Sequence, residues 1–241
     1  TVMNTASVML RSTVRKLGLI RAINFVRFKV LRLSREYEER FSEALLSSVK
    51  PGDIVWDIGA NLGFYTQQFL DRVGPGGKIV AFEPAPGCFD VLAGKFKNAP
   101  GVQLENAAMG AREGKVQMHL ANDPLAATHQ IMDDTQDSAE SGPGAGLVEV
   151  PVISGDSYWT HSKLTPNVIK IDVEGYEEQV LHGMSKLLKS RDLRSIFCEI
   201  HFALLEQRGE RMAPVRIEDL LKTSGFNTTW IDASHIQAMR N

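Results

Sequence analysis

The stretch from Ile54 to Thr66 constrains the fold of this chain more than any other part of its sequence. It begins with a short apolar run of β-branched and aromatic residues, which predicts a buried strand. Asp57 and two glycines follow, and apolar residues at helical spacing resume at Phe64. A strand, a glycine turn and a helix make up the first unit of a Rossmann-like sheet, in which ligands bind beyond the carboxyl ends of the strands.

The residues of this turn indicate the kind of ligand. A dinucleotide-binding turn has the pattern G-x-G-x-x-G, whose backbone amides bind a pyrophosphate. Here the pattern is D-x-G-x-N-x-G, with Asp57, Gly59, Asn61 and Gly63, and the middle glycine of the dinucleotide pattern is missing. The acid would repel a diphosphate, but it suits a ligand with a cationic end, such as the amino group of S-adenosylmethionine (SAM). Gly59 has no Cβ, so the backbone there can come close to the ligand.

A second acid supports a nucleoside ligand. Residues 78–83 predict the next strand, and Glu83 falls at its end. A carboxylate there can accept hydrogen bonds from both ribose hydroxyls of an adenosine, whether the ligand is NAD or SAM. Glu83 therefore indicates a nucleoside without separating the two cofactors, and the first turn favours SAM.

Length and composition predict one α/β domain, residues 50–241, after an N-terminal arm, residues 1–49. A chain of 241 residues with 43% hydrophobic and 23% charged content can bury a substantial core. Cys88 and Cys198 lack metal-ligand spacing, which predicts buried thiols in a reducing, cytoplasmic compartment. No apolar run approaches the roughly 18 residues that a membrane-spanning helix needs.

The arm is strongly basic. Residues 1–35 contain eight Lys and Arg residues and no acid, so this segment carries +8 and leaves −10 for the rest of a chain whose net charge is −2. Its apolar residues recur at helical intervals, which is typical of a helix that lies peripherally on anionic lipid or packs on the domain with a solvated basic face. A retained targeting segment is a further alternative. The acidic body and the lack of an aromatic-basic stacking pattern argue against nucleic acid as the partner.

Further strands are predicted over 102–106, 115–120, 147–153, 168–173, 195–201 and 226–231, with helices between several of them. Asn106 and Ala107 follow the third strand and would border the adenine, although asparagine is also common in turns. Pro151 suggests an edge position for its strand. Residues 122–146 show little periodicity and predict a mobile loop near the substrate mouth, with disorder as the alternative.

A second set of acids is expected at the same edge of the sheet. Side chains alternate along a strand, so Lys170, Asp172 and Glu174 share one side if that strand persists so far. Glu199 and His201 share a side at the end of the next strand, and the carboxyl ends of neighbouring strands are where ligands bind. We therefore expect these groups to converge, although Glu199 could instead be a structural acid with a backbone or arginine partner.

Four stretches together resemble the FkbM-type methyltransferases, in the family's order and with similar separations: VWDIGANLGFYT (55–66), FEP (82–84), IKIDVEGYE (169–177) and EIH (199–201). The resemblance implies a class I SAM-dependent O-methyltransferase with a Rossmann-like, mostly parallel seven-stranded sheet flanked by helices. It also implies acceptor hydroxyls on sugars, glycans or natural products. The implied SAM contacts are Asp57, Gly59, Ala60, Asn61, Tyr65, Thr66, Glu83, Asn106 and Asp172. The chain departs from the family at Ser154-Gly155-Asp156, where threonine-leucine-aspartate is usual, and in the arm and residues 122–146.

A hydroxyl acceptor needs a base, because its pKa lies far above neutrality and its proton must leave as the new bond forms. His201 is the first candidate, since an unperturbed imidazole titrates near pH 6.5. Asp172 or Glu174 could take the proton instead, or orient the base. A divalent metal held by carboxylates is conceivable, but the spacing does not establish one. The alternative functions are an NAD-linked oxidoreductase and a noncatalytic adaptor that acts through its basic arm.

Overall fold

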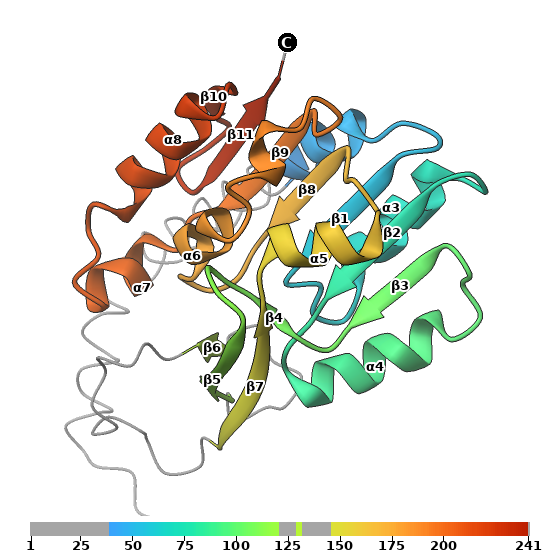
Figure 1. Cartoon of the computed structure of the whole chain (residues 1–241), viewed down its shortest axis with the longest axis horizontal. Helices are drawn as coiled ribbons and strands as arrows, with labels where there is room; N and C mark the ends of the chain where they lie inside the picture. Colours follow the sequence, from blue (N-terminus) through green and yellow to red (C-terminus); the bar gives the residue numbers. More distant parts are fainter. Residues whose placement is uncertain (1–38, 121–128, 132–145, 241) are drawn as a thin grey trace, which may run out of the picture. The chain divides into compact units, whose positions relative to one another are not determined.

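The structure, a computed structural model, describes residues 39–120, 129–131 and 146–240 (Figure 1). The chain divides into two units, Thr1–Glu43 and Ala44–Asn241, and the second contains both sheets. Most of the basic arm and most of residues 122–146 lie outside the described residues, so the predictions for them stay predictions. No helix in the described part of the chain has both the length and the apolar character that crossing a membrane requires.

A mostly parallel sheet of seven strands carries the fold. Its strands are β1 (Ile54–Ile58), β2 (Lys78–Phe82), β3 (Val102–Glu105), β8 (Val168–Ile171), β9 (Ser195–Glu199), β10 (Asn227–Trp230) and β11 (His235–Met239). The spatial order is β10-β11-β9-β8-β1-β2-β3, and β11 runs antiparallel to both of its neighbours. The other pairs, β1 with β2 and β8, β2 with β3, and β8 with β9, are parallel. The predicted class I fold is confirmed.

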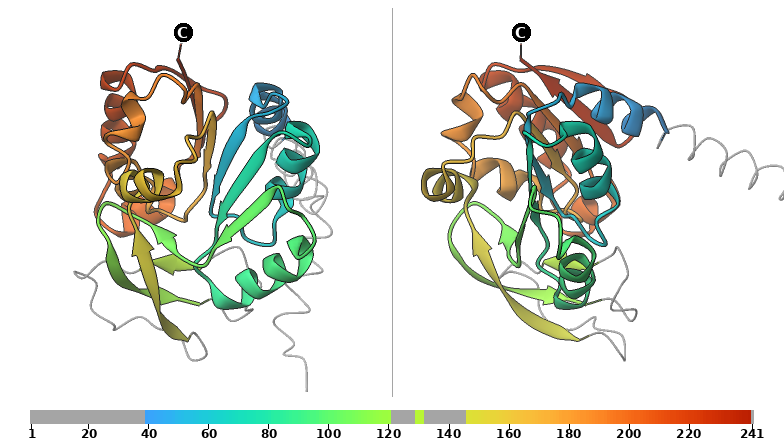
Figure 2. Two further views of the ribbon diagram at one scale, coloured as in Figure 1. Left: turned by 45° about the vertical axis from the view of Figure 1, so that its right-hand side comes forward. Right: turned by 90° about the vertical axis from the view of Figure 1, so that its right-hand side faces the viewer.

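Helices cover both faces of this sheet, with α6 and α8 on one face and α3 on the other (Figure 2). Two sequence signals set their limits: Pro86 opens α4, and Gly74 follows the last residue of α3. The helices are α3 (Phe64–Val73), α4 (Pro86–Phe96), α5 (Gly155–Ser162), α6 (Glu177–His182), α7 (Phe202–Gln207) and α8 (Ala213–Thr223), with a 3-10 turn η2 (Leu187–Lys189).

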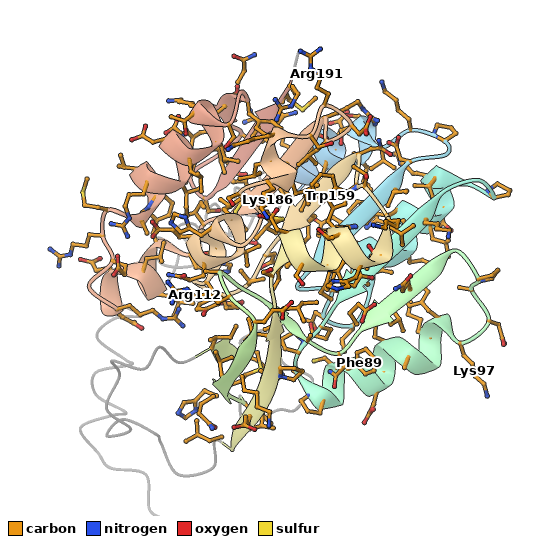
Figure 3. All side chains as sticks on the ribbon, viewed as in Figure 1. Phe89, Lys97, Arg112, Trp159, Lys186 and Arg191 are labelled. Atoms are coloured by element: carbon orange, nitrogen blue, oxygen red, sulfur yellow. The ribbon has the colours of Figure 1, made fainter. Side chains whose placement is uncertain are left out.

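The core lies between the large sheet and these helices. Trp56 in β1 is fully buried, and its ring packs edge-on against Phe82 and Tyr158 at 5.5 and 5.3 Å between centroids. Burial of such side chains is the main favourable contribution to folding. Charged side chains such as Lys97 and Arg191 are exposed and point away from the sheet (Figure 3).

A second sheet of four strands was not predicted. It contains β4 (Ala108–Met109), β5 (Gly114–His119), β6 (Gln130–Ile131) and β7 (Leu147–Ile153), in the order β4-β7-β5-β6. The edge position that Pro151 suggested for β7 is wrong, because β5 and β4 lie on either side of it. Among the described residues β4 pairs with β7 only at Val152 and Ile153, so one side of Pro151 has no strand beside it. A residue without an N–H is tolerated at such a position.

The strand predicted over 168–173 is shorter than expected. β8 ends at Ile171, so Asp172 and Glu174 are placed by the loop that follows and not by strand alternation. Glu174 has φ 54° and Gly175 φ 88°, two successive residues in the left-handed region, which turn the chain sharply. This turn, together with the segment after β9, shapes one end of the site.

Candidate active site

A cleft of about 640 Å³, counting the open space at its mouth, lies beyond the carboxyl ends of β1, β2 and β8. The second sheet contributes to its wall through Met109, Met118 and Ile131. Six predicted site residues line this cleft: Gly59, Asn61, Glu83, Ala107, Asp172 and Glu174. Six others are not in its lining: Asp57, Ala60, Tyr65, Thr66, Asn106 and His201. Both cysteines are buried thiols outside any disulfide, as predicted, and Cys88 also lines the cleft.

Gly59 sits where the glycine turn meets the loop after β8. Its φ is 80°, and a Cβ built on it would lie 1.8 Å from the backbone oxygen of Asp172. The amides of Gly59 and Ala60 both donate to the carbonyl of Phe82 at 3.0 Å. No residue with a side chain fits this position, so the turn is glycine-specific on the grounds of both conformation and space.

Glu83 and Asn61 provide acceptors at the end of the cleft where a nucleoside is predicted to bind. The Glu83 carboxylate accepts hydrogen bonds from the amides of Asn61 at 2.7 Å and Ala85 at 2.8 Å. Burial raises the pKa of Glu83 above its ordinary value, while those two amides oppose the rise. Each carboxylate oxygen has a second lone pair, so the group can still accept from a ribose hydroxyl. The side-chain oxygen of Asn61 is buried with no hydrogen-bond partner among the described residues, and it is an open acceptor beside the cleft.

Asn106 supports this end of the cleft indirectly. Its side-chain amide donates to the backbone oxygen of Glu83 at 2.9 Å, so it holds the segment that follows β2 in place. The predicted contact between Asn106 and the adenine remains a prediction, whereas its neighbour Ala107 does line the cleft.

Asp57 lies inside the protein and not on the cleft surface. Its side chain is fully buried, accepts a hydrogen bond from Thr66 Oγ1 at 2.6 Å and lies 3.4 Å from the ammonium of Lys170. Tyr65 packs its ring 5.5 Å from the same ammonium. The direct cofactor contacts expected from Asp57, Tyr65 and Thr66 thus remain predictions. In this geometry all three residues pack behind the glycine turn and support it.

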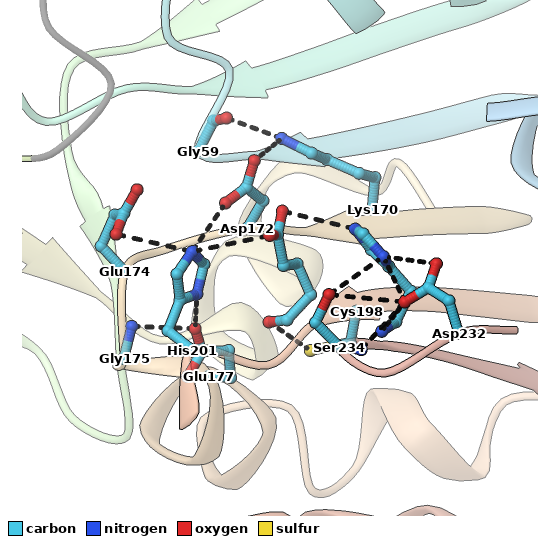
Figure 4. Close-up of polar contacts among 12 residues, drawn as sticks. Gly59, Lys170, Asp172, Glu174, Gly175, Glu177, Cys198, His201, Asp232 and Ser234 are labelled. Carbon is cyan, nitrogen blue, oxygen red and sulfur yellow. Dashed lines mark hydrogen bonds and ion pairs between the residues drawn. The ribbon is translucent and has the colours of Figure 1, made fainter. Parts of the chain in front are cut away.

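Acids from the loop after β8, from the start of α6 and from the end of β9 surround His201 at the other end of the cleft (Figure 4). Its Nδ1 donates to Oε1 of the fully buried Glu177 at 2.7 Å, which fixes the ring. Its Nε2 faces Asp172 at 3.7 Å, Glu174 at 3.5 Å and Glu199 at 4.0 Å. We call His201 and these four acids the acid–imidazole cluster. The predicted convergence of Asp172, Glu174, Glu199 and His201 is therefore present.

The electrostatics of the cluster differ from the expectation for an ordinary imidazole. Burial alone would lower the pKa of His201, but the hydrogen bond and charge of Glu177, with the charges of Glu174 and Asp172, raise that pKa to about 9. Burial raises the pKa of Glu174 to about 7, against the attraction of His201. His201 is therefore protonated at neutral pH. The pKa near neutrality that made His201 the first candidate for the base is found at Glu174 instead.

A second histidine extends the cluster, and sequence reasoning missed it. His235 in β11 places Nδ1 2.8 Å from Asp232 and Nε2 3.5 Å from Glu199. Burial opposes protonation, but Glu199 and Asp232 together raise the pKa of His235. Glu177 was quoted as part of a motif without a role, whereas the antiparallel strand that brings in His235 was not predicted. The acid–imidazole cluster also contains a group with possible metal-ligand geometry: Asp172, Glu199 and His201 present atoms that all lie within 4.8 Å of one another.

Comparison with known proteins identifies the family of the chain. A family model described as "Methyltransferase FkbM domain" matches residues 57–228. This chain belongs to the FkbM methyltransferase family. The family match includes all four stretches in which the resemblance was found except the first two residues of the earliest, and the suspected family is confirmed.

Two curated relatives of this FkbM family member have named activities. The hexuronic acid methyltransferase AglP of Haloferax volcanii is 29% identical over 167 residues, which is 68% of this chain and 62% of the relative. The 31-O-demethyl-FK506 methyltransferase FkbM of Streptomyces tacrolimicus is 27% identical over 176 residues, 64% of this chain and 67% of the relative. The chain thus spans less than two thirds of the length of AglP.

Solved structures resemble this FkbM family member more distantly. Fibrillarin of Aeropyrum pernix, solved with natively bound SAM, has 15% identity and a TM-score of 0.45 over 79% of this chain and 66% of its own. A SAM-dependent O-methyltransferase of Thermotoga maritima has 12% identity and a TM-score of 0.44 over 84% of this chain and 64% of its own.

The cofactor of this family member is SAM, as predicted, and family membership removes the NAD-linked alternative. The residues of the cleft fit the cofactor: Glu83 and the open oxygen of Asn61 offer acceptors to hydroxyl groups. At the other end, Asp172 offers negative charge to a cationic ligand.

Proposed function

We propose that this chain transfers a methyl group from SAM to a hydroxyl of a sugar, a glycan or a natural product. Family membership supports the methyl transfer, and the two relatives named for a hexuronic acid and for FK506 support a hydroxyl-bearing acceptor. The observation that carries the proposal is that Asp172 and Glu174 both line the cofactor cleft and both contact His201. The cofactor cleft and the cluster that accepts the proton therefore have Asp172 and Glu174 in common.

The division of roles follows from position and charge. SAM, when bound, supplies an electrophilic methyl group that the acceptor oxygen must approach in line. Glu174 is the proposed base, because it lines the cleft and a pKa of about 7 keeps a useful fraction of it unprotonated at neutral pH. The acceptor proton passes to the Glu174 carboxylate, and the open mouth of the cleft allows its later loss to water.

His201 and Asp172 orient that base. The imidazolium of His201 lies 3.5 Å from Glu174 and is anchored from behind by Glu177, so it holds the carboxylate in one place. Asp172 faces His201 with one oxygen and Lys170 with the other, at 3.7 and 3.3 Å. These contacts hold the reacting groups in a fixed geometry, and such positioning supplies much of the rate in a displacement reaction.

A labelled-methyl screen tests the proposal. The purified chain is incubated with methyl-labelled SAM and panels of sugars, glycans, lipids and polyketide alcohols, and the products are tested for a new methyl ether. Label on a hydroxyl oxygen in the wild-type protein, and its loss in Glu174→Gln, is the expected result. Label on nitrogen or carbon would replace the O-methyl assignment. Binding of SAM without transfer to any panel would favour the noncatalytic adaptor.

A further inference from the structure

Lys170 is a buried cation for which the proposed chemistry has no direct use. It lies in the central strand β8 with only 3% of its side chain exposed. A lysine is almost never fully buried unless it is paired. Burial by itself would lower the pKa of Lys170, but the charges of Asp172 and Asp57 outweigh it and raise the pKa above its ordinary value. The ammonium is therefore charged and needs a partner for each of its three N–H groups.

The ammonium makes one hydrogen bond and two ion pairs, each with a different residue. The ammonium donates to the backbone oxygen of Gly59 at 2.8 Å, and it lies 3.3 Å from Asp172 Oδ2 and 3.4 Å from Asp57 Oδ1 (Figure 4 draws the first two). Gly59 belongs to the glycine turn, Asp172 to the loop after β8, and Asp57 to β1. One side chain thus connects both loops at the carboxyl ends of adjacent strands.

Two of these partners line the cleft. Gly59 and Asp172 approach each other so closely that a Cβ added to Gly59 would collide with the backbone oxygen of Asp172. Lys170 sets the direction of the Gly59 carbonyl, and it holds one oxygen of Asp172 so that the other faces His201. We propose that Lys170 is a positioning residue, which sets the glycine turn and the Asp172 carboxylate in the one relative geometry that binds SAM. This inference rests on the proposed function.

The alternative is a buried ion pair that serves folding alone. The two possibilities separate in the variant Lys170→Met, which keeps the length of the side chain but removes the charge. In that variant Asp57 is a buried carboxylate whose remaining side-chain partner is Thr66. A buried charge without a charged partner lowers the stability of the fold, whether or not Lys170 has a role in SAM binding. Adding Asp57→Asn removes that charge, and the amide oxygen can still accept from Thr66. The double variant Lys170→Met/Asp57→Asn therefore restores charge balance without restoring the bond to Gly59.

The experiment measures SAM affinity by calorimetry and unfolding temperature for wild type, Asp57→Asn, Lys170→Met and the double variant. We expect Lys170→Met to lower both quantities and to weaken SAM binding by about tenfold or more. The double variant should regain most of the unfolding temperature but not the affinity. Asp57→Asn alone, in which Lys170 can still contact Gly59 and Asp172, should lose less affinity than Lys170→Met. Lys115→Met, which removes an exposed lysine of β5 paired with Glu149, is the matched control and should change neither.

Three outcomes would overturn the inference. Recovery of both stability and affinity in the double variant would make Lys170 a folding residue only. A loss of affinity in Asp57→Asn as large as that in Lys170→Met would assign the effect to Asp57. Equal affinity in all four proteins would remove both residues from cofactor binding. A wild-type chain that fails to bind SAM would instead overturn the proposed function, and the inference with it.

Discussion

The two ends of the cleft differ in the atoms that form them, which are backbone atoms at one end and side chains at the other. At the glycine turn, backbone atoms define the site: Gly59 lies against the backbone of Asp172, and backbone amides hold Glu83 in place. In the acid–imidazole cluster, the site consists of charged side chains gathered around His201. The glycine turn therefore depends on shape, and the acid–imidazole cluster depends on charge. We call them the shape end and the charge end of the cleft. Substitutions that add an atom should damage the first end, and substitutions that remove a charge should damage the second.

The sharpest test of the shape end is Gly59→Ala. Its Cβ would lie 1.8 Å from the oxygen of Asp172, so the turn or the loop must move, and we expect SAM binding to be abolished with a loss of stability of ~3 kcal/mol or more. Calorimetry and thermal unfolding measure both effects. Gly52→Ala is a matched control, because Gly52 has a similar φ of 85° with nothing within 4 Å of the added Cβ. The control should lose only about 1 kcal/mol and still bind SAM. Similar losses in the two variants would mean that conformation, and not contact with Asp172, explains the glycine.

The charge end is tested by Glu174→Gln, which keeps the shape of the side chain. Loss of the proposed base should lower kcat by roughly 10²–10⁴-fold with little change in SAM affinity. In the wild type, kcat should rise with pH through about 7, the pKa of Glu174, and not through about 9, the pKa of His201. Glu206→Gln removes an exposed acid outside the cluster and should leave the rate unchanged. A rate that climbs until pH 9 would return the role of base to His201.

The same contrast explains what the sequence could predict. The glycine turn is one continuous stretch, and its partner Glu83 follows an apolar run, so local pattern located both. Six of the seven strands of the large sheet were located for the same reason, because its central strands are mostly apolar. In the cluster, alternation predicted that Glu199 and His201 share one side of a strand, but β9 ends at Glu199 and His201 precedes α7. Asp172 and Glu174 likewise lie beyond the end of β8 and reach His201 through a left-handed turn.

The parts that were missed depend on contacts between distant segments. His235 enters the cluster because β11 pairs antiparallel with β9, and nothing in the short segment 235–239 distinguishes it from a loop. In the second sheet, the longer strands β5 and β7 were predicted over 115–120 and 147–153. The strands β4 and β6 were missed because two residues are too few to show a periodicity. The raised pKa of His201 likewise depends on Glu177, whose position follows from the turn at Gly175. Charge balance is a property of the assembled loops and not of any one motif.

Glu83→Gln should have a smaller effect than the first two changes, because it alters one acceptor and adds no bulk. The new amide group would face one of the two backbone donors, Asn61 or Ala85, and the charge available to ribose hydroxyls would be lost. We expect SAM affinity to fall about 10-fold to 100-fold, as measured by calorimetry. Glu105→Gln, at the end of neighbouring β3, changes an acid that does not line the cleft and should bind SAM normally. Equal losses in the two variants would argue against a specific contact at Glu83.

The smallest expected effect is on the pH dependence of stability, and it tests whether the second end is governed by charge even without a ligand. The pKa of His201 is about 9 in the folded protein against 6.5 for the free side chain. Folding therefore favours the protonated form, so the stability it contributes is fully present below pH 6.5 and is lost as the pH rises through 9. To keep Glu174 from titrating in the same window, we compare Glu174→Gln with Glu174→Gln/His201→Gln. The first should lose roughly 5 °C of unfolding temperature between pH 6.5 and 9, and the second should lose much less. His161→Gln in the Glu174→Gln background removes an exposed imidazole of α5 and should keep the full slope. Parallel curves in all three proteins would show that Glu177 does not hold a proton on His201, and the contrast between a shape end and a charge end would not stand.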